Sequence, residues 1–461
     1  MRDSDSLQDQ ASAAEATRMR WHQLLSSERH GHTALEPHEL GRSHFHKDYD
    51  RIVFSNAFRR LSGKTQVHPL SLNDHVHTRL IHSVEVGSVG RSLGLKVGER
   101  IQDELPDWIQ PDDLGVIVQS ACLAHDIGNP PFGHAGEFAI QDWFKQPQNA
   151  DLLAPLNDRQ RDDLRSWEGN AQGFRIVTQV EYHLFRGGLR LTYPTLATML
   201  KYPWTVAHKN AKGKFACFQH EASTLNHVAN RLGLLPRGEH AWCRHPLSYL
   251  MEAADDICYA IIDLEDAVDL RILSFAEVQA IMLRLNPQAE LDISGIQSDV
   301  QVAPLRQLAA LRGKAMQAVI DAVADAFMAQ IDVIMRGELA GDLLAYCPAH
   351  IQEGIAEAKN LARQKVFKDT HKTEVEIGAY TTLSTLLHAF LSAGHELHER
   401  QGQQLSYRTQ RVLDLMRDDA PEAEWSLYDI YLRILDYVTQ QTDQYANYLA
   451  KQIGGVPLMS R

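Results

Sequence analysis

Apolar residues recur with helical spacing along most of the chain from about residue 48. In "TRLIHSVEVGSVGRSLGLKVG" the positions i, i+4, i+7 and i+11 form one stripe, which carries His82, Val86, Val89 and Leu93. Similar periodicity continues in "LGVIVQSACLAHD", "LSYLMEAADDICYAIIDLEDAVDL", "AMQAVIDAVADAFMAQIDVIM" and "YDIYLRILDYVTQQTDQYANYLA". The pattern predicts a series of amphipathic helices, each with one buried face.

Alternating patterns typical of β-strands are scarce in this sequence. Only "GLRLTY" (residues 188–193) and "KFACF" (residues 214–218) have enough β-forming residues to suggest a short hairpin. We therefore predict an all-α fold with at most a short β-hairpin.

Changes in composition suggest three regions. Residues 1–30 are polar and Ala-rich, which predicts a loose tail followed by a short helix. Residues 31–283 would form a catalytic region, and residues 284–461 a C-terminal helical region. The polar stretch 284–304 is expected to be the loop between the last two regions.

Composition narrows the class of protein. The chain has 461 residues, of which 44% are apolar and 23% are charged, as is typical of a soluble globular protein. The polar N-terminus and the absence of long apolar runs predict a cytoplasmic protein with no membrane partner. Five scattered cysteines without a CxxC pair argue against a disulfide framework or a zinc ribbon. A net charge of −13 argues against a generally basic nucleic-acid binder, although a local basic groove would be compatible with it.

Ionisable residues stand on the otherwise apolar faces of three predicted helices. The first helix carries His82, the second ends in His125 and Asp126, and the third carries Asp255 and Asp256. Buried ionisable groups without partners are costly, and one divalent cation would satisfy all of them. The donor set suits Mn, Mg, Ni, Fe or Zn. A single histidine on such a face is more often an ordinary core residue, but the joint H…HD…D pattern is far more specific.

The H…HD…D pattern resembles the HD superfamily of metal-dependent phosphohydrolases. The chain is more closely similar to the deoxyguanosine triphosphate triphosphohydrolase (dGTPase-like) family of this superfamily. Six motifs in order carry this resemblance: "DRIVFSNAFRRLSGKTQV", "HTRLIHSVEV", "AHDIGNPPFGHAGE", "EGNAQGFRI", "LTYPTLATMLKYPW" and "EAADDICYAIIDLEDA". It implies an HD-domain helical fold with its core at about residues 79–264 and additional C-terminal helices.

The resemblance implies metal ligands at His82, His125, Asp126 and one of the two paired aspartates. We choose Asp255, because Tyr259 and Asp263 follow it at i+4 and i+8 and therefore share its helix face. In the family, a tyrosine under the sugar and an aspartate that binds the 3′-hydroxyl follow the metal ligand at these spacings. Asp256 points about 100° away, and we expect it to be a solvated or capping carboxylate.

The turn after the second helix carries two more ionisable residues. Gly128, Pro130 and Pro131 end the helix, and His134 and Glu137 follow on one face of the next helical turn. The family's catalytic histidine and its carboxylate partner match His134 and Glu137. We expect His134 to exchange a proton with the attacking water or the leaving 5′-oxygen, while Glu137 orients it and raises its basicity.

Further residues match substrate contacts of the family. Arg79 lies one turn before the first metal ligand, and the others stand in "KTQV", "EGNAQG", "KYP" and "KGKF". A triphosphate brings up to four negative charges to an acidic protein, so local cations are required. Asn170 falls where some relatives carry a second active-site histidine, and an amide cannot replace it as an acid or base. The complete set of predicted substrate contacts is Gln66, Arg79, Asn170, Lys201, Tyr202, Lys214, Tyr259 and Asp263.

Three functions are compatible with these residues. The first is a metal-dependent dNTP triphosphohydrolase, which converts dGTP or another dNTP and water into a deoxynucleoside and tripolyphosphate. The second is an HD nucleotidase or phosphodiesterase of other specificity, and the third is a catalytically idle regulator that binds nucleotide or single-stranded DNA. Family members often form hexamers and can respond to nucleotides or DNA at second sites. The resemblance therefore implies a homo-oligomer and leaves a nucleotide or single-stranded DNA effector open.

Overall fold

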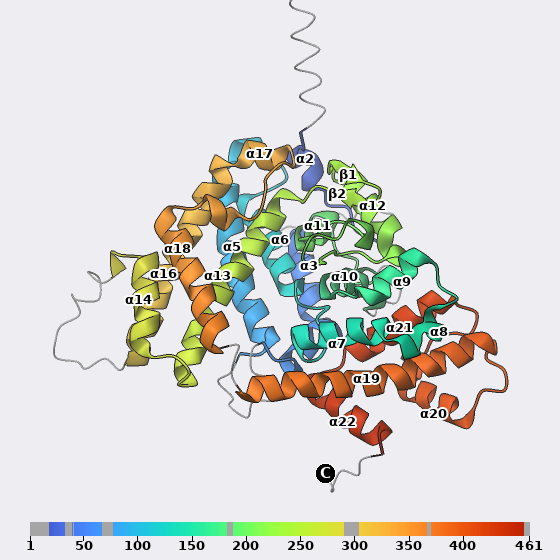
Figure 1. Cartoon of the computed structure of the whole chain (residues 1–461). Coiled ribbons are helices and arrows are strands. Elements are labelled where there is room, and N and C mark those ends of the chain that lie inside the picture. The colour runs from blue at the N-terminus through green and yellow to red at the C-terminus, as the bar shows by residue number, and fades with distance from the viewer. Residues whose placement is uncertain are drawn as a thin grey trace, which may run out of the picture.

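The computed structural model describes residues 18–32, 39, 41–66, 77–181, 188–289, 304–366 and 370–455. Within these residues the fold is almost entirely helical, as predicted, with one small antiparallel sheet (Figure 1). No helix in the described part of the chain has the length and apolar character needed to cross a membrane. The predicted loop at 284–304 lies mostly outside the described residues.

The described helices of the N-terminal half begin with α2 and end with α14. They are α2 (Trp21–Leu24), α3 (His44–Val53), α4 (Asn56–Arg60), α5 (Arg79–Arg100), α6 (Pro111–Ala124), α7 (Gly133–Lys145), α8 (Ala150–Leu153), α9 (Asp158–Arg165), α10 (Gly169–Arg175), α11 (Tyr193–Met199), α12 (Ala222–Arg231), α13 (Pro246–Asp269) and α14 (Phe275–Leu285). The C-terminal half adds α16 (Pro304–Ala329), α17 (Ile331–Met335), α18 (Ala349–Leu361), α19 (Thr370–Glu399), α20 (Tyr407–Met416), α21 (Leu427–Thr439) and α22 (Asp443–Ile453).

The hairpin forms in a different place from the one expected. Strands β1 (Pro236–Gly238) and β2 (Ala241–Trp242) pair antiparallel. The two stretches that suggested a hairpin form only isolated bridges, between Thr192 and Arg29 and between Cys217 and Thr205. Each therefore pairs with another segment rather than with the other stretch, and local β-forming composition did not reveal those partners.

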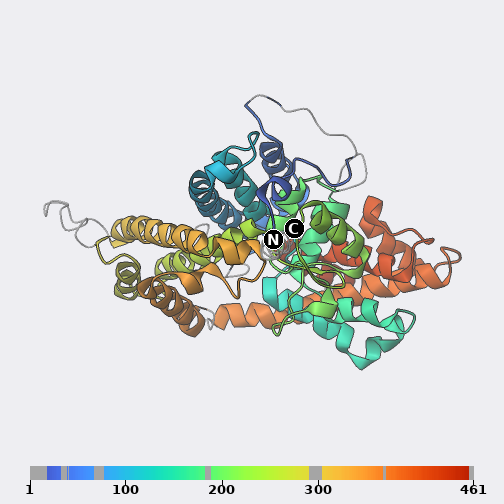
Figure 2. The same ribbon diagram turned by 90° about the horizontal axis from the view of Figure 1, so that it is seen from above.

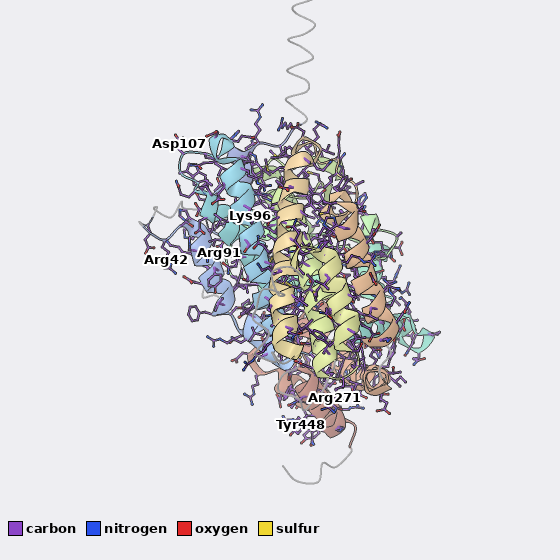
Figure 3. All side chains as sticks on the ribbon, turned by 90° about the vertical axis from the view of Figure 1, so that its left-hand side faces the viewer. Arg42, Arg91, Lys96, Asp107, Arg271 and Tyr448 are labelled. Carbon is purple, nitrogen blue, oxygen red and sulfur yellow. The ribbon has the colours of Figure 1, made fainter. Side chains whose placement is uncertain are left out.

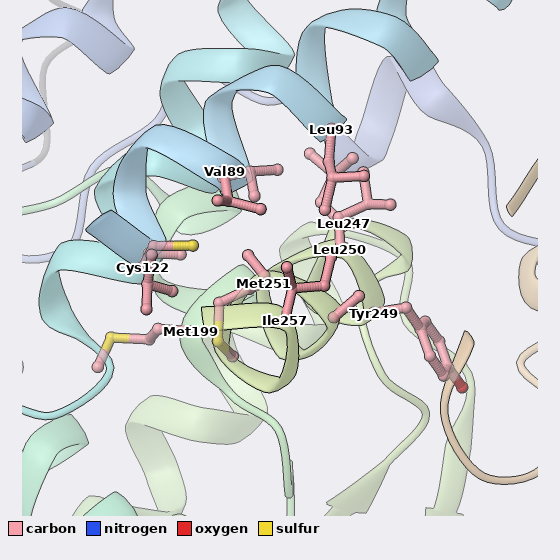
Figure 4. Close-up of a cluster of buried hydrophobic side chains, with 14 of the residues drawn as sticks. Val89, Leu93, Cys122, Met199, Leu247, Tyr249, Leu250, Met251 and Ile257 are labelled. Carbon is pink, nitrogen blue, oxygen red and sulfur yellow. The ribbon is translucent and has the colours of Figure 1, made fainter. Parts of the chain in front are cut away.

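Helices α5, α6 and α13 form the centre of the molecule. Figure 4 shows side chains from all three meeting in one apolar cluster, including Val89, Cys122 and Ile257. Helices α5 and α6 lie unusually close, because a Cβ atom at Gly94 would stand 2.7 Å from the backbone oxygen of Leu114. A residue larger than glycine would push these helices apart, so their ends hold a fixed relative position.

The C-terminal helices cover two different sides of this centre. In Figures 1 and 2, α14, α16 and α18 lie on one side, and α19 to α22 extend toward the other. Figure 3 faces the first side, where Lys96 of α5 forms an ion pair with Asp321 of α16 at 2.9 Å. On the second side, α7 shares an apolar cluster with α19, α21 and α22, to which Ile140, Phe390 and Leu435 belong.

Candidate metal centre and catalytic turn

Three helices bring two histidines and one aspartate together. His82 lies on α5, His125 caps the C-terminus of α6, and Asp255 lies on α13. Asp255 Oδ1 stands 3.1 Å from His82 Nε2 and 3.6 Å from His125 Nε2. One ligand atom from each of the three residues lies within 4.8 Å of the others, so the group could hold a metal ion.

The orientation of His125 suits metal binding. Its Nδ1–H donates to the backbone oxygen of Cys122 at 2.5 Å, which leaves Nε2 directed toward Asp255. A backbone acceptor on one ring nitrogen is the usual way in which a protein fixes the ring of a metal-ligating histidine.

Asp126 borders this group and binds two neighbours of its own. Its Oδ1 lies 3.5 Å from His125 Nε2, and Asn129 donates to the same oxygen. Its Oδ2 accepts from Arg79 at 2.6 Å. Burial opposes ionisation of Asp126, but His125, Arg79 and His82 outweigh it and hold the pKa of this carboxyl at about 2.

The electrostatics of the group favour a positive charge at its centre. Burial alone would lower the pKa of His125, yet the carboxylates of Asp126 and Asp255 raise it to about 9. Burial would raise the pKa of Asp255, but the two histidines hold it well below its ordinary value. A divalent cation would supply such a positive charge without the protons.

Asp255 and Asp256 face different surroundings. Asp256 pairs with Lys359 of α18 at 2.9 Å, and burial raises the pKa of its carboxyl. Of these two aspartates, only Asp255 contacts His82 and His125 within the described residues. Asp255 therefore belongs to the group that could hold a metal ion, and Asp256 contacts the C-terminal half instead.

The turn between α6 and α7 is tightly constrained. Phe132 adopts a left-handed conformation with φ of 65° directly before α7. A Cβ atom at Gly128 would stand 2.1 Å from the backbone oxygen of Gly169, so only glycine permits this approach. The turn places His134 in the first turn of α7.

His134 and Glu137 form a hydrogen-bonded pair. His134 Nδ1 lies 2.9 Å from Glu137 Oε2, and the histidine side chain is 76% exposed while that of Glu137 is buried. Gly169 N donates to the other carboxylate oxygen at 2.9 Å. Burial would raise the pKa of Glu137, but His134 and Lys214 outweigh it and lower the pKa to about 2. Glu137 is therefore a fixed negative charge behind an accessible imidazole.

The predicted cations lie around the site, each paired with a carboxylate. Arg79 binds Asp126 as described above, and Lys214 Nζ contacts Glu137 at 3.2 Å and Glu168 at 2.5 Å. Lys201 Nζ contacts Glu252 at 3.1 Å, one turn before Asp255 on α13. The positive charges stand close to both the metal group and the catalytic turn.

Two of the other predicted polar contacts, Tyr202 and Asn170, lie near these cations. The Tyr202 ring lies 5.7 Å from Lys201 Nζ, and burial raises the pKa of the Tyr202 hydroxyl. Asn170 donates through its side-chain amide to Glu168 at 3.1 Å. Gln66 follows Thr65, and its buried Oε1 has no hydrogen-bond partner among the described residues.

Tyr259 and Asp263 continue the line of Asp255 along α13, which runs unbroken from Pro246 to Asp269. Burial raises the pKa of Tyr259, and the charge of Asp263 adds to this shift. Burial together with Asp266 and Asp255 raises the pKa of Asp263 well above its ordinary value. The buried Oδ2 of Asp263 has no hydrogen-bond partner in the described part of the chain, so it is available to a ligand.

The chain is similar to known proteins over most of its length. Residues 79–201 match the model of the HD domain. A deoxyguanosinetriphosphate triphosphohydrolase-like protein of Pseudomonas aeruginosa (strain LESB58) is 50% identical over 441 residues, which cover 95% of this chain and 99% of that protein. A protein with the same description from Synechocystis sp. (strain ATCC 27184 / PCC 6803 / Kazusa) is 39% identical over 95% of this chain and 100% of its own length.

The chain belongs to the deoxyguanosinetriphosphate triphosphohydrolase-like family. This confirms the family predicted from the six motifs and makes the protein an HD-domain hydrolase. The deoxyguanosinetriphosphate triphosphohydrolase of Enterobacter sp. (strain 638) is also similar, with 30% identity over 93% of this chain and 96% of that protein.

Sequence reasoning missed several members of the site in this family member. Glu168 binds Lys214, Glu252 binds Lys201, and Lys64 donates to the backbone oxygen of Asn129. Glu168 stands in a quoted motif, "EGNAQG", and could have been selected as a carboxylate beside a predicted cation. Lys64 also stands in a quoted motif, "KTQV", but nothing in that motif indicated its contacts, because its partners are backbone atoms.

Proposed function

We propose that the protein is a metal-dependent dNTP triphosphohydrolase, which hydrolyses dGTP or another dNTP to the deoxynucleoside and tripolyphosphate. The observation that carries this proposal is the convergence of His82, His125 and Asp255 beside the turn that presents the His134–Glu137 pair. Family membership supports a hydrolase that acts on deoxynucleoside triphosphates.

The side chains present fit a divalent metal ion. Two imidazole nitrogens and carboxylate oxygens from Asp255 and Asp126 form a mixed donor set of the kind that binds Mn, Mg, Ni, Fe or Zn. When bound, the metal would polarise a phosphate oxygen and make a nearby water more acidic. We propose His82, His125, Asp126 and Asp255 as its ligands.

His134 is the proposed proton-transfer group. Its Nδ1 is held by Glu137, so Nε2 is the ring nitrogen that remains for the water or for the leaving 5′-oxygen. Glu137 stays charged and stabilises the protonated imidazole, because Gly169 N and Lys214 both bind its carboxylate. Attack on the α-phosphorus breaks its bond to the 5′-oxygen and releases intact tripolyphosphate.

The cations around the site would bind the phosphates. Arg79, Lys201 and Lys214 each hold a carboxylate in the structure, and these ion pairs keep the cations in place before substrate arrives. Phosphate oxygens could share the remaining donors of the same groups, since a guanidinium has five and an ammonium three. Gln66, Asn170 and Tyr202 are proposed as further substrate contacts.

The sugar is proposed to lie along α13. A nucleotide with its α-phosphate at the metal group would place its ribose over Tyr259 and its 3′-hydroxyl toward Asp263. The unpartnered buried oxygen of Asp263 supports this placement, because a buried carboxyl needs a hydrogen-bond partner. A ring under C2′ leaves no room for a 2′-hydroxyl, which favours deoxynucleotides.

The same family membership supports three further expectations. We expect a cytoplasmic protein, a homo-oligomer such as a hexamer, and Mn or Mg as effective metals. An effector site for nucleotide or single-stranded DNA is an expectation of the same kind. Measurement of molecular size with and without these ligands would check the oligomeric state and the effector site together.

The test is a product assay with each of the four dNTPs in Mn²⁺ and in Mg²⁺. We expect deoxynucleoside and tripolyphosphate in equal amounts, with no monophosphate. The matched control is His134→Ala, which should keep metal and nucleotide but lose about 10²–10⁴-fold in kcat because proton transfer is removed. Release of a nucleoside monophosphate would identify an HD enzyme of another specificity, and nucleotide binding without any turnover would identify an idle regulator.

A further inference from the structure

Asp443, the first residue of α22, joins two segments that border the candidate site. Its side chain is 2% exposed. Oδ1 accepts from Phe132 N at 2.9 Å, and Oδ2 accepts from Thr65 N at 3.0 Å and Thr65 Oγ1 at 2.8 Å. One carboxylate thus holds the turn that leads into the catalytic helix and the residue next to Gln66.

Lys64 ties the same turn to the preceding helix of the C-terminal half. Its side chain is also 2% exposed. Nζ donates to Asn129 O at 2.6 Å and to Thr439 O, the last residue of α21, at 2.8 Å. The start of the turn, at Asn129, and its end, at Phe132, are therefore both held from the corner between α21 and α22.

The turn needs external support. Phe132 has φ of 65°, a backbone conformation that residues other than glycine seldom adopt. It persists only when surrounding contacts enforce it. Its N–H is buried and finds its acceptor in Asp443, outside the turn. His134 follows two residues later, so a change in the backbone conformation of Phe132 would move the imidazole relative to His82, His125 and Asp255.

We propose that Asp443 and Lys64 are positioning residues that hold the catalytic turn in its reactive geometry. The proposal rests on the proposed function of the site. It gives the C-terminal helices a role in the reaction, since they supply both Asp443 and the backbone oxygen of Thr439. Misplacement of a catalytic group by about 1 Å can cost about 10²-fold in rate, so small displacements matter.

Three substitutions remove these contacts in graded steps. Thr65→Val removes one hydrogen bond to Asp443 and should lower kcat about 2-fold. Asp443→Asn keeps one acceptor oxygen and should lower kcat about 10-fold, while Asp443→Ala should lower it about 10²-fold. Metal content should stay within about 2-fold of wild type in all three, because no metal ligand changes. KM should change less than kcat, because among the proposed substrate contacts only Gln66 adjoins a residue that Asp443 holds.

The matched control is Tyr428→Phe. The Tyr428 hydroxyl of α21 donates to the buried Asp163 Oδ2 at 2.5 Å, so it also joins the two halves, but its partner lies on α9 rather than in the turn. We expect this variant to lower the melting temperature as Asp443→Asn does, with kcat unchanged. A loss of kcat that follows the melting temperature alike in both variants would overturn the positioning role.

Amide hydrogen exchange tests whether Asp443 and Lys64 hold the turn, without relying on activity. Exchange in a peptide that covers residues 129–137 should accelerate in Asp443→Asn and in Lys64→Met, and stay as in wild type in Tyr428→Phe. Unchanged exchange there, together with unchanged kcat, would overturn the proposal. If the wild-type protein hydrolyses no dNTP, the proposed function fails. The exchange result still decides whether Asp443 and Lys64 hold the turn.

Discussion

The two adjacent aspartates of α13 have different partners, and this difference indicates which of them is the candidate metal ligand. Asp255 faces His82 and His125, whereas Asp256 faces Lys359. Helix geometry predicted that they point in different directions, since consecutive residues differ by about 100° around the axis. The expectation that Asp256 is a solvated or capping carboxylate was wrong, because its side chain is 21% exposed and pairs with Lys359.

We predict that Asp255→Ala loses bound metal and nearly all turnover while the fold survives, because the two imidazoles lose their shared carboxylate. His125→Ala should behave alike, and Asp256→Ala should keep metal and most of the activity. Metal content by elemental analysis and dNTP hydrolysis check this on the same samples. The reverse order of the two aspartate variants would show that Asp256 is the ligand.

Tyr259 should decide between deoxyribose and ribose. We predict that wild type hydrolyses dGTP much faster than GTP, and that 2′,3′-dideoxy-GTP is a poor substrate because Asp263 loses its 3′-hydroxyl partner. Tyr259→Ala should relax the discrimination against GTP more than it lowers the rate with dGTP. The measurement is kcat/KM for both nucleotides, and equal wild-type values would remove Tyr259 from the sugar site.

At the element scale, α13 depends on a neutral histidine at its N-cap. His245 Nδ1 accepts from Leu247 N at 3.2 Å, and its Nε2 donates to Leu24 O at 3.1 Å. Burial lowers the pKa of His245 to about 4, against about 6.5 for an ordinary histidine. A protonated ring could no longer accept from Leu247, so the cap requires the neutral form.

The free energy of unfolding should therefore fall in acid. The contribution of His245 is complete above about pH 6.5 and is lost as the pH falls toward 4, because only the unfolded state binds the proton in that interval. Between pH 7.5 and pH 5, wild type should lose about 2 kcal/mol more than His245→Asn, which caps a helix without titrating. Urea unfolding at both pH values measures this difference, and an equal loss in both proteins would contradict it.

The elements could be predicted where a repeating pattern specifies them. The stripe that carries His82, Val86 and Val89 is buried along α5, because one face of a helix must cover the core. The hairpin could not be placed in this way. Pro236 and Gly238 are poor strand residues, and their strand is fully exposed, so no buried face produces an alternating pattern there.

At the scale of the whole molecule, the C-terminal half is divided between two sides of the core. Its first helices pack on α5 and α13, whereas α19, α21 and α22 share an apolar cluster with α7. A buried ion pair also joins α10 to α21, since Arg175, which binds Glu221 of its own half, contacts Asp436 of α21 at 2.8 Å.

Long-range contacts of this kind were beyond sequence reasoning. Lys64 and Asp443 are 379 positions apart in the sequence (443 minus 64). Lys64 bonds to the backbone of Asn129 and Asp443 to the backbone of Phe132, and no pattern of side chains in the sequence indicates such backbone partners. The approach of His82, His125 and Asp255 could be predicted, because these residues lie on periodic helices and match a known order. The support for the catalytic turn depends on how the complete chain packs.

We propose that water attacks the α-phosphorus and releases tripolyphosphate, and hydrolysis of dGTP in oxygen-18-labelled water follows this step. Phosphorus NMR and mass spectrometry then follow the label in the products. We predict unlabelled deoxyguanosine and tripolyphosphate with one labelled oxygen on a terminal phosphorus, in equal amounts, and neither product with the His134→Ala variant above its residual rate. Label in deoxyguanosine, or the appearance of dGMP with pyrophosphate or of dGDP with phosphate, would contradict this account.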